Sequence, residues 1–373
     1  MKKIVKPILQ VLSLALVLVT VILFISNVLC FQCSSDEARL KLFYNEKEDS
    51  FEVMLFGSSS VRAGFIPTQA YEKYGITSYD YCINHMPMAT TKYMIKEALS
   101  TQSPKLIVID INAITYCNKE ATHTASVGFT DSIKDGTNRS EAIKALSDEE
   151  SWEDQLSFVK YHKNIYSLSK CLKYGTYYQL YGNHKTILKG YTTNPAHITP
   201  FEDEQVLDHN QLTEVATFNE YESECVEDLM NYCNTIKDTT EILFVRFPRP
   251  TIKNLNEWEM KYINAMEKRI EEEGYTFVDF TDYLDEIGID MLTDFTDETH
   301  FNQFGAEKFT DYLCEYMKAN YELTEYSDLS DWDYCVEMAK PYYEVIKDET
   351  LKQTYQEYFE LDFAKRYKVF GVA

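Results

Sequence analysis

A serine-rich turn early in the chain has the composition of a nucleophile site. Residues 53–56 form a short apolar run that predicts a buried strand, Gly57 ends this run, and Ser58 and Ser59 follow it. A serine on a sharp turn after a strand has its hydroxyl lifted clear of the sheet, and N–H groups at the start of the next helix can face a developing oxyanion. The alternative interpretation is an ordinary strand-to-helix turn whose serines cap the helix.

A second candidate block lies far downstream, where Asp297 and His300 stand three residues apart. On one helical turn or in a tight loop, this spacing places both side chains on one side. A carboxylate beside an imidazole selects its tautomer and stabilises the imidazolium, as a general base requires. The alternative is a helix-start pair with His300 on the surface. The two blocks together predict a Ser59–His300–Asp297 triad that closes across a parallel sheet, with Ser59 and His300 within hydrogen-bond reach.

These two blocks together resemble the SGNH (GDSL-type) hydrolase superfamily, over roughly residues 51–318. The superfamily's serine is the third residue of a Gly-Asp-Ser-like block, which corresponds here to Ser59, with Ser58 in the place of the aspartate, as in membrane-anchored members. The resemblance implies a three-layer, flavodoxin-like α/β fold with a parallel five-stranded sheet. It also implies acyl transfer through a covalent intermediate on Ser59.

The resemblance also indicates the oxyanion donors. The superfamily's oxyanion asparagine corresponds to Asn112, in a block of residues 110–113 that departs from the usual Gly-x-Asn-Asp at Asp110 and Ala113. With the backbone amide of Ser59, Asn112 would stabilise the oxyanion. The superfamily's glycine block resembles residues 82–90, which contain Asn84 but no glycine.

Three further side chains are candidates for substrate binding: Arg62, Asn84 and Arg246. Arg62 follows the serine turn, and Arg246 ends a predicted strand, where a guanidinium could hold a phosphate or carboxylate. Ion pairing in an acidic protein is the alternative for Arg246, and a simple surface charge for Arg62. The nine cysteines show no zinc-like framework, so we expect no metal and no cofactor, mostly buried thiols, and we assign no disulfide.

Apolar runs along the chain predict the sheet that must position these residues. The expected strands are residues 53–56, 77–83, 106–111, 241–247 and 275–280. An amphipathic helix is predicted over residues 90–99, between the second and third strands, which is the spacing of a βαβ unit. Residues 71–76 are expected to be a short connector.

The N-terminus predicts a membrane anchor. Residues 7–29 carry no charge and are long enough to span a bilayer. Lysines at positions 2, 3 and 6 place the N-terminus in the cytoplasm, so the remainder would lie outside the cell as a single-pass membrane protein. A cleaved signal peptide is the alternative, although no small-x-small cleavage site precedes Cys30.

We expect four regions. Residues 1–35 form a cytoplasmic stub and signal anchor, residues 36–50 a juxtamembrane linker, residues 51–320 the catalytic domain, and residues 321–373 a helical appendage with aromatic stripes. Residues 116–239 interrupt the α/β pattern and are interpreted as an insertion, which could form a lid or substrate groove or simply add packing.

Composition excludes some partners. The 36 basic and 60 acidic residues give a net charge of −24, which argues against nucleic acid and against docking on anionic lipid. Because the protein is acidic overall, a polyanionic substrate would have to bind at a local cluster of basic residues.

An N-terminal anchor before an SGNH-like domain is similar to the D-alanyl-lipoteichoic acid transfer protein (DltD) family and to the SGNH partners of membrane-bound O-acyltransferases. This resemblance implies an acyltransferase or esterase of the bacterial cell envelope, acting on acetyl or D-alanyl esters of polysaccharide or teichoic acid, with a membrane-bound O-acyltransferase as partner. The alternative is a non-catalytic surface protein with a degenerate site that binds glycan or a partner.

Overall fold

The computed structural model describes residues 2–29, 35–134, 136–147, 162–169, 171–172, 186–192, 212–250 and 253–347. It is an α/β structure built on a five-stranded sheet in the order β2-β1-β3-β4-β5, and every strand pair is parallel. This is the flavodoxin-like order, in which the strand order reverses between β1 and β3. All five predicted strands are present, namely β1 (Val53–Gly57), β2 (Ser78–Cys82), β3 (Leu106–Asp110), β4 (Glu241–Arg246) and β5 (Thr276–Asp279).

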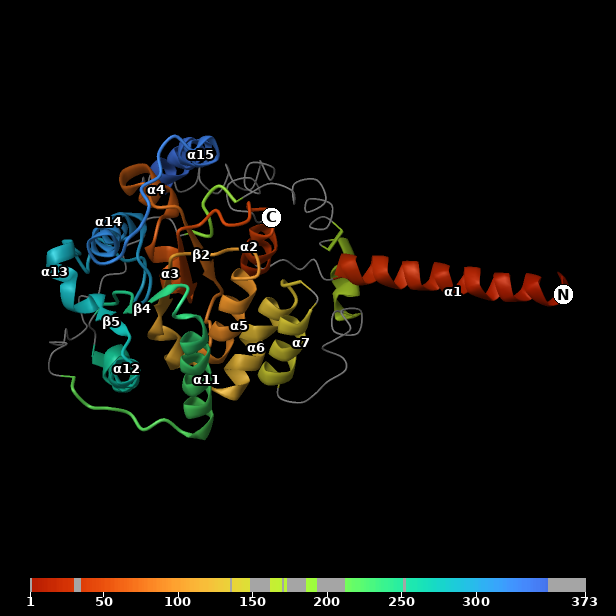
Figure 1. Ribbon diagram of the computed structural model, residues 1–373, viewed down its shortest axis with the longest axis horizontal. Coiled ribbons are helices and arrows are strands. Elements are labelled where there is room, and N and C mark those ends of the chain that lie inside the picture. The colour runs from red at the N-terminus through yellow and green to blue at the C-terminus, as the bar shows by residue number, and fades with distance from the viewer. Residues whose placement is uncertain are drawn as a thin grey trace.

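Strands β1, β2 and β3 are buried along their whole length, and the sequences of β1 and β3 are mostly apolar, as burial on both faces requires. Along β1, Val53 and Leu55 belong to one hydrophobic cluster, and Met54 and Phe56 belong to the other. The sheet is therefore the middle of three layers, with helices on either side (Figure 1).

One helical layer covers the face with Met54 and Phe56. Its members are α2 (Ser35–Phe43), α5 (Met88–Ala98), α11 (Glu220–Ile236) and α12 (Lys253–Glu272), with α6 (Lys119–Thr130) and α7 (Thr137–Leu146) beside α5. Helices α6 and α7 fall in the predicted insertion, and both pack on α5. This part of the insertion thus extends the helical layer.

The opposite layer contains α3 (Ser59–Gly64), α4 (Pro67–Tyr74), α14 (Gln303–Asn320) and α15 (Ser330–Lys347). The expectation of a short connector at residues 71–76 was wrong in part, because α4 extends to Tyr74. Pro67 begins this helix and the left-handed Gly75 ends it. Residues 321–329 are not helical, but α15, which follows them in the C-terminal appendage, packs against α4 and α14 and is thus docked on the domain.

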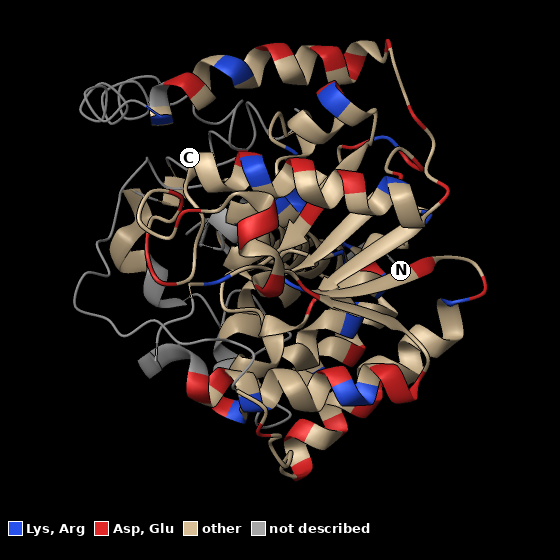
Figure 2. Ribbon diagram, turned by 90° about the vertical axis from the view of Figure 1, so that its left-hand side faces the viewer, with Lys and Arg blue, Asp and Glu red and all other residues tan. Residues whose placement is uncertain are grey.

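The first helix, α1 (Lys2–Leu29), projects away from the globular part (Figure 1). Its segment Val5–Ile25 has a mean hydropathy of 2.9 and is long and apolar enough to cross a membrane. In the globular part, Figure 2 shows charged residues mainly on the outer helices and few on the strands. The cysteines within the described ranges are all buried.

Candidate active site

The serine turn joins β1 to α3 at the edge of the sheet where the strands end. Ser58 caps α3 with an extended backbone, and Ser59 is the first residue of the helix. Gly57 is needed here because an added Cβ would come within 2.3 Å of the Val61 side chain and 2.9 Å of the Asp110 Cβ. The turn therefore fits tightly against β3, and Ser59 is held at the switch point of the sheet.

The block with Asp297 and His300 is a loop directly before α14 and not a helical turn. The Asp297 carboxylate accepts hydrogen bonds from the backbone N–H groups of Thr299 (2.9 Å) and His300 (3.0 Å). Around the loop, Phe295 and Phe301 form an isolated antiparallel bridge, and their rings stack 4.6 Å apart. The loop is thus shaped by its own backbone hydrogen bonds and an aromatic pair beneath it.

The structure brings the three predicted triad residues together. The Ser59 Oγ lies 2.6 Å from the His300 Nε2. The His300 Nδ1 lies 2.8 Å from each oxygen of the Asp297 carboxylate. The side chain of His300 is 22% exposed and Ser59 is 8% exposed, so the serine is buried and the imidazole is partly open to solvent.

The Asp297 carboxylate is kept ionised. Burial alone would raise its pKa, but hydrogen bonds and charge from His300 and hydrogen bonds from Thr299 outweigh this effect and lower the pKa to about 2. An ionised acceptor at Nδ1 favours the tautomer with a proton on Nδ1. The Nε2 atom is then free to accept the proton of the Ser59 hydroxyl.

The expected oxyanion role of Asn112 is not supported by its position. Asn112 is fully buried, and its Nδ2 donates to the Asp110 carboxylate (2.9 Å) and to the Phe247 carbonyl (3.4 Å). Both amide hydrogens thus already have acceptors, and the side chain joins the end of β3 to the residue that follows β4. The Ser59 N–H, at the start of α3, has no acceptor within the helix and remains the expected oxyanion donor.

Asp110 is the centre of a buried network that sequence reasoning missed. Its carboxylate accepts hydrogen bonds from the Ser60 hydroxyl (3.2 Å), the Phe247 N–H (3.2 Å) and the Asn112 backbone and side chain. Burial raises its pKa to about 6, although Arg249 and these N–H donors favour the charged form. The only available signal was the position of Asp110 at the end of a strand, next to the serine turn.

The substrate-binding role expected for Arg246 is also not supported. Arg246 is fully buried at the end of β4, where it pairs with Asp279 of β5 (3.2 Å) and with Glu259 of α12 (3.8 Å). Its Nε also donates to the Asn112 side chain (3.4 Å). The guanidinium is therefore held inside the protein by its ion pairs with these two carboxylates.

The other two binding candidates lie closer to the serine turn. Arg62 is half-buried in α3, and its Nη1 donates to the side chain (2.5 Å) and the carbonyl (3.2 Å) of Thr192. Asn84 is half-buried in the turn after β2, the strand whose Cys82 pairs with Gly57. His85, next to it, has a positive φ of 50° and is exposed.

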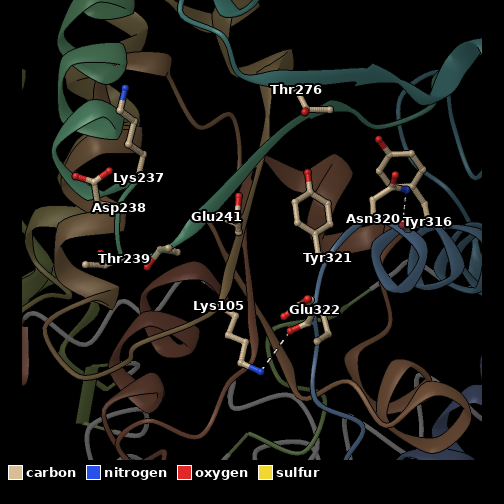
Figure 3. Close-up of a pocket in the computed structure, with 12 residues that line it drawn as sticks. Lys105, Lys237, Asp238, Thr239, Glu241, Thr276, Tyr316, Asn320, Tyr321 and Glu322 are labelled. Atoms are coloured by element: carbon tan, nitrogen blue, oxygen red, sulfur yellow. Dashed lines mark hydrogen bonds between the residues drawn. The ribbon is translucent and has the colours of Figure 1, made fainter.

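A cavity of about 750 Å³ lies at the opposite edge of the sheet, where the strands begin (Figure 3). Lys105 precedes β3, Glu241 begins β4 and Thr276 begins β5, and all three line this cavity. None of the triad residues lines it. Within the part of the chain that the structure describes, no group of three or more His, Cys, Asp or Glu is placed to hold a metal ion.

Comparison with protein-family models gives no match, and comparison with curated proteins gives none either. Among solved structures, one match is described as a gut microbial diltiazem-metabolizing enzyme, at 10% sequence identity and a TM-score of 0.33. The match covers 73% of this chain and 48% of the solved chain, so this chain spans about half of that structure's length.

Proposed function

We propose that this protein is a serine acyltransferase or esterase that works through a Ser59–His300–Asp297 triad. The supporting observation is the continuous chain of short contacts from the Ser59 hydroxyl through the imidazole to an ionised carboxylate. A serine hydroxyl is a weak nucleophile unless an adjacent base accepts its proton. The 2.6 Å contact with His300 supplies that base.

In the proposed reaction, His300 removes the proton from Ser59 as the Oγ attacks the carbonyl carbon of an ester or thioester. The Ser59 N–H stabilises the oxyanion, and Asp297 stabilises the imidazolium. His300 then protonates the leaving alcohol or thiol, which leaves an acyl group on Ser59. Water or an acceptor hydroxyl, activated by the same histidine, attacks this acyl-enzyme and regenerates the serine.

The proposed setting is the outer face of a bacterial membrane. The resemblance of the two triad blocks to the SGNH superfamily, and the α1 helix with lysines at its start, support an anchored extracytoplasmic enzyme. Its substrates would be acetyl or D-alanyl esters of cell-envelope polysaccharide or teichoic acid, and a membrane-bound O-acyltransferase would be its partner. The triad serves hydrolysis and transfer equally well.

A second candidate function is non-catalytic binding of glycan or a partner by a degenerate SGNH-like domain. The observation that favours it is the engagement of Asn112 with Asp110 and Phe247, which removes a side-chain donor from the oxyanion site. A site with fewer donors stabilises the tetrahedral intermediate less well.

The two candidates are separated by the reactivity of Ser59. Full-length protein in detergent is treated with a fluorophosphonate probe, and the adduct is located by mass spectrometry. We expect labelling on Ser59 that is lost in Ser59→Ala and His300→Ala. The matched control is Ser60→Ala, which alters the neighbouring serine of the same turn and retains the labelled hydroxyl. Folded wild-type protein without an adduct would favour the binding function.

A further inference from the structure

Residues 186–192, called the strap below, run along the outer edge of β2. The Lys189 carbonyl accepts a hydrogen bond from the Asp80 N–H (3.0 Å). Gly190 has a φ of 95°, and an added Cβ would lie 2.2 Å from the Asp80 carbonyl oxygen. Lys189 forms a buried ion pair with Glu46 (2.9 Å). The strap is thus a fixed part of the fold, although it belongs to the predicted insertion.

One end of the strap contacts the serine half of the site. The Thr192 N–H donates to the Arg62 carbonyl (3.0 Å), and the Arg62 guanidinium donates back to the Thr192 hydroxyl (2.5 Å) and carbonyl (3.2 Å). Arg62 lies one turn of α3 after Ser59, on the same side of the helix. These reciprocal bonds hold the short helix that carries Ser59.

The adjacent residue contacts the histidine half. Tyr191 is fully buried, and its hydroxyl donates to the Gln303 side-chain oxygen (2.8 Å). Gln303 is the first residue of α14, three residues after His300, and its own amide donates to Glu307 (2.9 Å) in the same helix. The strap therefore bonds to the start of the helix that follows the histidine loop.

We propose that Tyr191, Thr192 and Arg62 are positioning residues that set the distance between Ser59 and His300. The proposal rests on the proposed function. The serine turn and the histidine loop come from opposite ends of the domain sequence. Two consecutive strap residues connect them. Thr192 is bonded to α3, which carries Ser59, and Tyr191 is bonded to α14, which follows the His300 loop. Proton transfer from Ser59 to His300 depends steeply on the geometry of this contact, so a small displacement of either helix lowers the rate of acylation.

Positioning of α3 and binding of substrate are different roles for Arg62, and they predict different kinetics. Loss of a substrate contact that is equal in the ground and transition states raises KM and leaves kcat unchanged. Loss of positioning lowers kcat and leaves KM near its original value. For Tyr191, whose buried hydroxyl faces Gln303, we likewise expect loss of the hydroxyl to lower kcat and to leave KM near its original value.

The test uses full-length protein in detergent with p-nitrophenyl acetate as substrate and a fluorophosphonate as active-site probe. The variants are Tyr191→Phe, Thr192→Val and Arg62→Ala. The matched control is Tyr343→Phe, which removes the hydroxyl of a half-buried tyrosine, bonded to Thr68 (2.6 Å) and not to α3 or α14. The Tyr343 ring lies 6.1 Å from that of Tyr191, so both changes affect the same layer.

We expect each of the three variants to lower kcat and the rate of probe labelling by about tenfold, with KM within about twofold of wild type. Tyr343→Phe should lower thermal stability as much as Tyr191→Phe does while retaining wild-type kcat. A rise in KM at constant kcat in Arg62→Ala, or variants that react as fast as Tyr343→Phe, would overturn the positioning role alone. Wild-type protein without turnover that depends on Ser59 would instead overturn the proposed function and this inference with it.

Discussion

The two edges of the sheet both hold acidic and hydroxyl side chains, but in different arrangements. At the edge where the strands end, a serine, a histidine and an aspartate are joined in sequence by contacts of 2.6 and 2.8 Å. At the edge where the strands begin, an open cavity of about 750 Å³ is lined by lysines, acids and hydroxyl groups (Figure 3). Cavity volume and the ordering of polar side chains by directed hydrogen bonds are therefore separate properties in this molecule.

The carboxylates at the two edges illustrate the difference. Glu52, just before β1, is bonded to the Lys105 ammonium (2.8 Å) and to the Thr324 N–H (2.7 Å). Burial raises its pKa, but these partners outweigh the effect and lower it. Asp297 is also kept ionised, but its partner is an imidazole whose other nitrogen lies 2.6 Å from the Ser59 hydroxyl. The first carboxylate fastens the C-terminal segment to the sheet, whereas the second can support catalysis.

The largest expected effect is the loss of the nucleophile. Ser59→Ala should lower kcat for p-nitrophenyl acetate by about 10³-fold or more, because no other hydroxyl in the turn is bonded to His300. Steady-state kinetics of full-length protein measures this effect. Activity retained in Ser59→Ala would show that the reacting group lies elsewhere and would remove the distinction between the two edges.

A smaller but still large effect is expected for Asp297→Asn. This change keeps the shape of the side chain but removes the charge that stabilises the imidazolium, and it allows the wrong tautomer of His300. The expected fall in kcat is about 10²- to 10⁴-fold with little change in KM. An unchanged kcat would mean that Asp297 only shapes its loop through the N–H bonds of Thr299 and His300.

The third prediction concerns the stability of the network behind the serine. The pKa of Asp110 is about 6 in the folded protein, above the ordinary value of about 4 expected for the unfolded chain. Between pH 4 and pH 6 the folded state binds more protons than the unfolded state. The contribution of Asp110 to the stability of the folded state is therefore fully present below pH 4 and is lost as the pH rises through 6. The loss amounts to about 3 kcal/mol at most.

Asp110→Asn removes this titration, so the stability of wild-type protein relative to the variant should fall between pH 4 and pH 7. Thermal unfolding at a series of pH values measures the difference. Asp297 has the opposite sign, because its pKa is lowered and its contribution is lost only as the pH falls below 4 towards 2. If the difference in thermal stability between wild type and Asp110→Asn does not change with pH, the raised pKa of Asp110 is contradicted.

The smallest effect is expected at the edge with the large cavity. Lys105→Met removes the ammonium that pairs with Glu52, but the side chain is 51% exposed, so the change should cost about 1 kcal/mol or less. Probe labelling of Ser59 should stay within about twofold of wild type. A large loss of labelling in Lys105→Met would show that the two edges are coupled.

The sequence by itself determined the sheet and the two blocks that hold the triad residues. Stretches such as residues 106–109 are continuous apolar runs, and such runs in alternation with helices are stable only when buried between two layers. Gly57 with Ser59, and Asp297 with His300, are local patterns whose geometry depends mainly on neighbouring residues. Their meeting was predictable because the turn after β1 and the loop after β5 open at the same edge of a parallel sheet.

Only the tertiary structure decided the roles of the remaining polar residues. Asn112 is turned towards Phe247, Arg246 pairs with Asp279, and Arg62 is bonded to Thr192. In each case the partner is far away in the sequence, and the direction of a long polar side chain depends on which donors and acceptors the fold places beside it. The physical reason is the cost of burying an unpaired polar group, which makes the nearest available partner decide the orientation.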